Sequence, residues 1–146
     1  MSRTVIIGSD HAGYNLKEDI KQYLSSYKVI DIGCDDSNRC DFNDYANTLS
    51  QQVLEHKNSF GIIICGTGVG VSIACNKYDN SIRCALCHNV YTAKQSRNHI
   101  DVNVLALGGR LLAPEYAKEI IFAFLNEPFY GGAPYNERVD KLSRRL

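Results

Sequence analysis

Residues 60–77 read F-G-I-I-I-C-G-T-G-V-G-V-S-I-A-C-N-K. The first six residues are nearly all apolar, which is typical of a parallel strand with both faces covered. Glycines follow at alternate positions, and residues 69–76 can then form a short helix. A strand, a glycine turn and a helix in this order predict an α/β fold.

The rest of the chain repeats this alternation. Short apolar runs predict further strands at residues 4–8, 28–32, 81–86 and 102–107. Helical spacing of apolar residues, with a proline suited to one first turn, predicts helices at residues 14–27, 45–56, 89–98, 114–126 and from about 136. Residues 34–43 are polar and predict a loop. Strands that alternate with helices favour a parallel sheet that helices cover on both faces.

Length and charge narrow the class of protein. The 146 residues fit one domain, spanning residues 1–146. The 16 basic and 16 acidic side chains balance, which argues against nucleic-acid binding and against electrostatic adhesion to a membrane. We find no apolar run of transmembrane length and no signal peptide before the first strand, so we expect a cytoplasmic protein.

The six cysteines are interpreted as reduced thiols, as is usual in the cytosol. Four of them stand in apolar surroundings, where a free cysteine behaves as a small hydrophobic residue: Cys65, Cys75, Cys84 and Cys87. The Cys84-x-x-Cys87 pair has His88 beside it but no obvious fourth ligand. We therefore predict no metal site.

Ligands of a parallel sheet bind outside the carboxyl ends of its strands, so the residues after each predicted strand are candidates for a site. After the third strand, residues 66–70 read G-T-G-V-G at the start of a helix. This loop lacks both the Gly-Lys-Ser/Thr of a Walker loop and the glycine spacing of a dinucleotide fingerprint. Its N–H groups can converge on an anion, either a phosphate or an oxyanion formed during a reaction.

Cys65 directly precedes this loop and lies in the same positive field. We expect its thiol to ionise more easily than a free thiol and to act as a nucleophile or a base. A cysteine phosphatase would need an arginine in place of Val71, and no papain-like local motif is present. A base that removes a proton next to a carbonyl group suits the N–H loop, which can stabilise an enediolate. The competing interpretation is a buried strand cysteine followed by a tight turn.

Other candidates stand at strand ends or on late helices. Asp10 and His11 lie in G-S-D-H-A-G after the first strand, where Asp10 can also be a helix cap. Arg110 follows two glycines after the fifth strand, and an arginine at this edge binds phosphate well. Taken alone, His99 in S-R-N-H indicates a surface residue. The basic residues of the last helix, taken alone, indicate a solvated face: Arg138, Lys141, Arg144 and Arg145.

In combination these motifs are specific. The order G-S-D-H-A-G, I-C-G-T-G-V-G-V-S-I-A-x-N-K, S-R-x-H and N-V-L-A-L-G-G-R resembles the type B ribose-5-phosphate isomerases, a family that includes galactose-6-phosphate and allose-6-phosphate isomerases. The resemblance implies a three-layer Rossmann-like sandwich with a five-stranded parallel sheet flanked by helices. It also implies a cofactor-free aldose–ketose isomerase that converts ribose 5-phosphate to ribulose 5-phosphate through an enediolate, in the non-oxidative pentose phosphate pathway. Its active sites would lie between the subunits of a homodimer, or of a dimer of dimers.

The resemblance assigns roles to individual residues. Cys65 matches the base that moves a proton between C1 and C2, Thr67 the hydroxyl that assists transfer at the oxygens, and His99 the residue that opens the furanose ring. The matches for substrate binding are Gly66, Gly68, Val69, Gly70 and Ser72 around the enediolate, Asp10 and Tyr45 at the sugar, and His11, Arg110 and Arg138 at the phosphate.

Two positions depart from the family pattern. Ile100 stands where the family commonly has an asparagine, and Pro134 stands near an expected arginine, for which Lys141 and Arg144 are the candidate substitutes. The presence of His99 favours a pentose phosphate, because the lactose-pathway relatives usually lack this histidine. The alternatives are an isomerase of a six-carbon sugar phosphate, such as allose 6-phosphate or galactose 6-phosphate, and a non-catalytic phosphosugar-binding protein.

Overall fold

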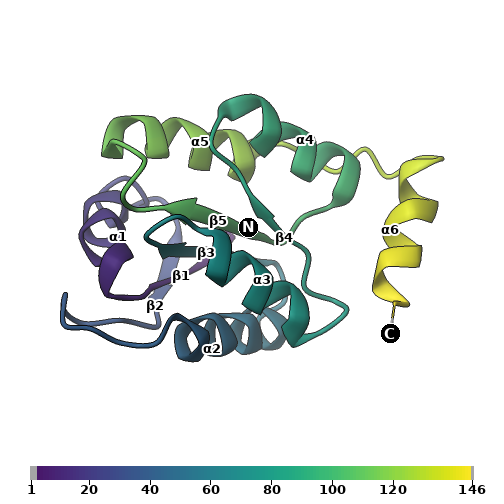
Figure 1. The fold of residues 1–146 in the computed structure, drawn as a ribbon. Coiled ribbons are helices and arrows are strands. Elements are labelled where there is room, and N and C mark those ends of the chain that lie inside the picture. The colour runs from purple at the N-terminus through teal and green to yellow at the C-terminus, as the bar shows by residue number, and fades with distance from the viewer. Residues whose placement is uncertain (1–2, 146) are drawn as a thin grey trace.

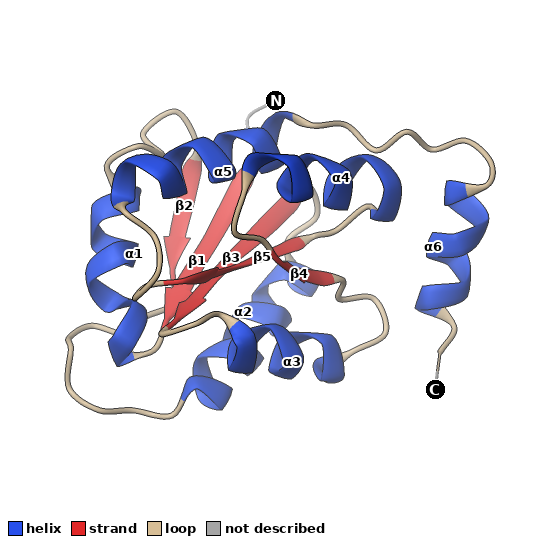
Figure 2. Ribbon diagram, turned by 45° about the horizontal axis from the view of Figure 1, so that its top comes forward, coloured by secondary structure: helices blue, strands red, loops and turns tan. Residues whose placement is uncertain are grey.

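The five predicted strands form one parallel sheet. A computed structural model describes residues 3–145 and gives the strand order β2-β1-β3-β5-β4, with every neighbouring pair parallel. The strands are β1 (Thr4–Ser9), β2 (Lys28–Asp31), β3 (Ser59–Cys65), β4 (Cys84–Leu86) and β5 (Val104–Gly108). The predicted α/β sandwich with a five-stranded parallel sheet is therefore confirmed (Figure 2).

Helices cover both faces of this sheet. They are α1 (Tyr14–Lys21), α2 (Phe42–Glu55), α3 (Val69–Tyr78), α4 (Val90–Ile100), α5 (Pro114–Asn126) and α6 (Tyr135–Ser143), with a 3-10 turn at His11–Gly13. Helices α1, α4 and α5 pack on one face and α2 and α3 on the other, while α6 stands apart beyond α4 (Figure 1). Within residues 3–145, none of the helices is both long enough and apolar enough to cross a membrane.

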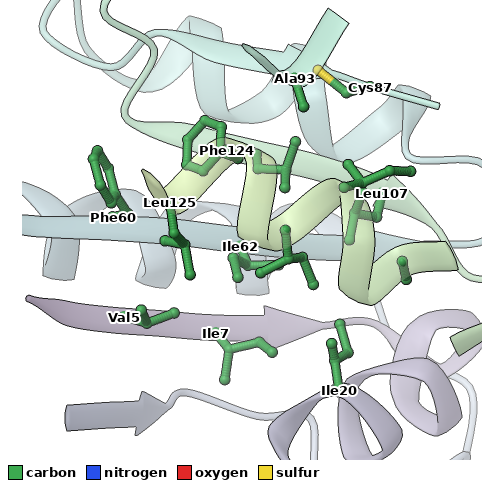
Figure 3. Close-up of a cluster of buried hydrophobic side chains, with 14 of the residues drawn as sticks. Val5, Ile7, Ile20, Phe60, Ile62, Cys87, Ala93, Leu107, Phe124 and Leu125 are labelled. Carbon is green, nitrogen blue, oxygen red and sulfur yellow. The ribbon is translucent and has the colours of Figure 1, made fainter. Parts of the chain in front are cut away.

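The alternation of side chains along the strands divides the core into two clusters. Val5 and Ile7 point into the cluster under α1, α4 and α5 (Figure 3). Ile6 between them points into the cluster under α2 and α3. In the first cluster the Phe60 and Phe124 rings meet edge to face, with centroids 5.2 Å apart. The apolar runs of the sequence are thus buried on both faces, as a central parallel strand requires.

Several boundaries differ from the sequence prediction, and at two of them a side chain bonds to the backbone at the end of the element. Helix α2 begins at Phe42, inside the predicted loop, because the Asp41 carboxylate accepts the Asn43 N–H (2.8 Å) and caps the helix. Strand β4 begins only at Cys84, because the Arg83 N–H donates to the Asn103 side chain (2.8 Å). Helix α1 ends at residue 21, six residues before the predicted end, in a series of turns.

An ion-pair network ties α1 to the end of β2. The Lys17 side chain is only 1% exposed, and its ammonium group lies 2.7 Å from Asp31 Oδ2 and 3.0 Å from Glu18 Oε2. Asp31 also accepts from Lys21 (2.7 Å) and from the Gly33 N–H (2.9 Å). Burial works to raise the pKa of Asp31, but the bonds from Lys17, Lys21 and Gly33 outweigh it and lower the pKa below its ordinary value.

We expect Asp31→Asn to lower the free energy of unfolding by about 1–3 kcal/mol at neutral pH. Lys17 then keeps Glu18 as a partner, and the 24% exposure of the Asp31 side chain reduces the cost further. Because the pKa of Asp31 is lowered on folding, its contribution is present above about pH 4 and disappears as the pH falls through the folded-state pKa.

Urea unfolding of both proteins at neutral and acidic pH checks this prediction, with Asp19→Asn, which replaces an exposed carboxylate on α1, as the matched control. The difference between wild type and Asp31→Asn should shrink as the pH drops. A difference that stays constant down to about pH 2 would contradict the assignment.

Candidate active site

The candidate site lies where the strand order reverses. Chain connections run outward in opposite directions from β1 and β3, and ligands of open α/β sheets bind at such a switch point. The Asp10 N–H donates to the Ile64 carbonyl (3.1 Å), and the Gly109 N–H donates to the Cys65 carbonyl (2.7 Å). These bonds bring the segments that follow β1, β3 and β5 to one edge of the sheet.

Cys65 ends β3 with its side chain 6% exposed. Its sulfur accepts a hydrogen bond from the Gly68 N–H (3.2 Å). Gly68 has φ of +80°, and a Cβ at this position would lie 2.5 Å from Leu86 Cδ1 and 3.0 Å from the Leu107 carbonyl. Both the backbone conformation and the lack of space therefore require glycine here.

The loop after Cys65 leads into the N-terminus of α3. The N–H groups of Gly70 and Val71 lie in the first helical turn and have no acceptor within the helix. The exposed Thr67 accepts the Val69 N–H on Oγ1 (3.2 Å), and the Ser72 hydroxyl donates to the Val69 carbonyl (2.8 Å). Together with the helix dipole, the free N–H groups form a site for an anion.

Arg110 adds a full positive charge to this loop. Its backbone N–H donates to the Gly66 carbonyl (3.0 Å), which holds the segment after β5 against the segment after β3. A Cβ on Gly66 would lie 2.9 Å from Arg110 Nη1, so the guanidinium group passes directly over this glycine. The predicted role of Arg110 as a phosphate ligand is compatible with this placement.

Asp10 and His11 form the other wall of the site. The Asp10 carboxylate is buried and accepts the Ala12 and Gly13 N–H groups on Oδ1 (2.9 and 3.1 Å), so it does cap the turn that follows. His11 Nδ1 lies 3.3 Å from the Cys40 backbone nitrogen and 3.9 Å from the Cys40 sulfur. Cys40 was not among the predicted site residues, because a polar loop carries no pattern that reveals a contact 29 residues away.

Tyr45 on α2 closes this wall. A Cβ on Gly33 would lie 3.0 Å from its ring, so the tyrosine packs directly on the backbone that follows β2. Burial raises the pKa of the Tyr45 hydroxyl, and the neighbouring Cys40 and Cys34 thiols raise it further. Burial likewise raises the pKa of Cys40. Tyr45 is therefore a neutral hydroxyl that can donate or accept a hydrogen bond near neutral pH.

His99 and Arg138 do not join the other predicted site residues within one chain. The His99 ring stacks on Tyr135 of α6, with centroids 4.2 Å apart, and the Arg138 guanidinium carbon lies 5.6 Å from the centre of the same ring. The last turn of α4 lies at the amino end of β3, where the Arg97 guanidinium carbon is 4.5 Å from the centre of the Phe60 ring. Five strand residues, about 16 Å, separate Phe60 from Cys65.

Two clefts flank these groups. One of about 440 Å³ lies between α2 and α3 and includes Phe42, Gly70 and Ile73. The other, of about 660 Å³, lies between α6 and the edge of the sheet, and Ile100 and Leu142 line it. Across residues 3–145, no three His, Cys, Asp or Glu side chains are grouped so that they could hold a metal ion.

Comparison with known proteins gives consistent results. A family model described as Ribose/Galactose Isomerase matches residues 5–142. Ribose-5-phosphate isomerase B of Escherichia coli (strain K12) is 40% identical, over 97% of this chain and 95% of its own. D-erythrulose-4-phosphate isomerase of Pectobacterium atrosepticum is also 40% identical, over 93% of this chain and 92% of its own.

The structural comparison agrees. The crystal structure of a ribose 5-phosphate isomerase from Thermotoga maritima is 39% identical and superposes with a TM-score of 0.94, covering 99% of this chain and 100% of that one. The family match and these relatives extend over nearly the whole chain. The protein therefore belongs to the ribose/galactose isomerase family and is an isomerase.

Proposed function

We propose that the protein interconverts ribose 5-phosphate and ribulose 5-phosphate through an enediolate, without a cofactor. The observation that carries the proposal is the position of Cys65, whose sulfur accepts the Gly68 N–H at the entrance to an anion-binding helix terminus. A base next to an oxyanion site is what proton transfer beside a carbonyl group requires. The named activity of the Escherichia coli and Thermotoga maritima relatives supports this choice of substrate.

In the proposed reaction the Cys65 thiolate takes the proton from C2 of the open-chain aldose and returns it to C1. The negative charge that develops on the substrate oxygen is stabilised in the loop from Gly66 to Gly70, where the Gly70 N–H has no acceptor within the helix, and Val69 and Ser72 complete the first turn of α3. The Thr67 hydroxyl, which is exposed beside this loop, assists proton transfer between the two oxygens. A compartment that keeps thiols reduced, the cytosol, suits this chemistry, and all six cysteines are free.

The substrate phosphate is assigned to His11, Arg110 and Arg138, and the sugar hydroxyls to Asp10 and Tyr45. Arg110 is well placed because its guanidinium group already lies over Gly66. Asp10 uses only Oδ1 for its two backbone bonds, so Oδ2 is available to a substrate hydroxyl.

His99 is assigned to ring opening, which requires the protein to act as a homodimer. His99 and Arg138 are held with Tyr135 at the far edge of their own chain, so a second copy is the natural source of both groups. Helix α3 supplies an apolar surface for such a contact, because Val69 and Ile73 on its outer side are 48% and 54% exposed. An apolar helix with such an exposed side is expected to be covered in an assembly.

We expect kcat/KM to be highest for ribose 5-phosphate when it is measured beside allose 6-phosphate, galactose 6-phosphate and D-erythrulose 4-phosphate. The last compound belongs in the set because a relative named for it is as similar to this chain as the Escherichia coli enzyme. A clear preference for another sugar phosphate would replace the proposed substrate. Ligand-induced thermal stabilisation without any turnover would indicate a non-catalytic binding protein instead.

A further inference from the structure

We propose that the backbone N–H of Cys40 is a positioning group for the substrate site. It holds the His11 imidazole in the tautomer that carries its proton on Nε2, so that the Nε2–H is the donor offered to the substrate phosphate. The inference rests on the proposed function in one respect, which is the role of His11 as a phosphate ligand.

The backbone N–H of Cys40 donates to Nδ1 of His11, and the Cys40 sulfur lies close to the same nitrogen. The backbone nitrogen lies 3.3 Å and the sulfur 3.9 Å from His11 Nδ1. A proton on Nδ1 would face the backbone N–H, which has no lone pair to accept it. The neutral ring is therefore protonated on Nε2, because the hydrogen bond made by one ring nitrogen decides which nitrogen carries the proton.

The Cys40 N–H is itself held in place at both ends of its loop. On one side the Ser9 N–H donates to the Gly33 carbonyl (2.8 Å) and the Cys34 N–H donates to the Ser9 carbonyl (2.9 Å), which ties the loop to the end of β1. On the other side Asp41, the next residue, caps α2. The donor is thus preorganised by the fold.

Asp31 strengthens the first of these anchors. Its carboxylate accepts the Gly33 N–H (2.9 Å) while the nearly buried Lys17 holds the carboxylate itself. These contacts fix the start of the loop, whereas Cys40 at its end contacts the imidazole directly. Cys40 acts on the substrate only through His11, so its effect should depend on the presence of that histidine.

This dependence is tested by a double-mutant cycle on KM for ribose 5-phosphate. Cys40→Pro removes the N–H that fixes the tautomer, so the His11 Nε2–H is no longer held ready for the charged phosphate. KM should rise about tenfold with a much smaller change in kcat, because this hydrogen bond lies away from the reacting carbons. His11→Ala should raise KM at least as much. The double variant should resemble His11→Ala alone, since the two changes remove one interaction.

The proposal would be overturned if the KM increases of the two single variants multiply in the double variant. It would also be overturned if Cys40→Pro leaves KM unchanged. If the proline only disrupted the loop, it would raise KM by a similar factor in the wild-type protein and in His11→Ala.

Nitrogen NMR of the histidine side chains provides a test that does not depend on the proline variant folding. At about pH 8, where an ordinary imidazole is neutral, the wild-type His11 should show a bare Nδ1 and a protonated Nε2. Cys40→Ala, which keeps the N–H, should give the same spectrum. A proton on Nδ1 in the wild type would overturn the proposal.

Addition of inorganic phosphate to the same sample separates the two claims. If phosphate leaves the His11 signals unchanged, His11 is not a phosphate ligand, and that part of the proposed function fails. The positioning of the ring by Cys40 is judged separately, from the tautomer observed without phosphate.

Discussion

Cys65→Ser is expected to lower kcat for ribose 5-phosphate by at least about 100-fold, within the range of roughly 10²–10⁴ that general-base catalysis contributes. A serine hydroxyl does not ionise near neutral pH, so it cannot take the C2 proton even though the Gly68 N–H can still bond to it. The fold should persist, because serine is no larger than the cysteine it replaces. Steady-state kinetics and thermal unfolding of the same preparation check both statements.

Cys87→Ser is the matched control for this experiment. Cys87 is also buried near the end of a strand, but it packs in the core under α4 and α5, and burial raises the pKa of its thiol. We expect its replacement to change kcat by less than about twofold. If Cys65→Ser keeps more than about a tenth of the wild-type kcat, Cys65 is not the base.

A second large effect is expected when two inactive variants are combined. Co-expressed Cys65→Ala and His99→Ala chains should recover about a quarter of the wild-type activity, although each is nearly inactive alone. With random pairing about half of the dimers are mixed, and in each mixed dimer one site receives both lesions and the other receives neither. The physical reason is the separation of Cys65 from His99 within one chain, at opposite edges of the sheet.

Differential tags on the two chains make the outcome decisive. If mixed dimers are isolated and remain inactive, each site takes both residues from one chain, and the shared site is wrong. Recovery in the mixed fraction alone supports the shared site, because each homodimer carries a single lesion in every site.

The arrangement of the site around Cys65 could be predicted well from the sequence. An apolar strand that ends in Cys65 and a glycine loop places this cysteine at a helix N-terminus, and the carboxyl-edge rule of parallel sheets brings Asp10, His11 and Arg110 to the same edge. These predictions depend on the apolar pattern of each strand and on the repeated alternation of strands with helices, and both can be read directly from the sequence.

The position of His99 at the opposite edge of the sheet from Cys65 can also be predicted from the sequence. Helix α4 begins near the carboxyl edge, and its 11 residues rise by about 16 Å, which returns the chain to the amino edge. The contact of Cys40 with His11 cannot be predicted in this way, because a hydrogen bond between a turn and an irregular loop leaves no periodic pattern in the sequence. The start of α2 inside the polar segment had a visible signal, Asp41, which is a favoured helix cap.

Proton transfer through an enediolate is tested most directly by converting ribose 5-phosphate in D₂O with the purified wild-type protein and following the product by proton NMR. We expect ribulose 5-phosphate to form and part of it to carry deuterium at C1, because the proton held by Cys65 can exchange with solvent before it is returned. Ribulose 5-phosphate that contains no solvent deuterium at C1 would indicate a direct hydride shift, and it would contradict proton transfer through an enediolate.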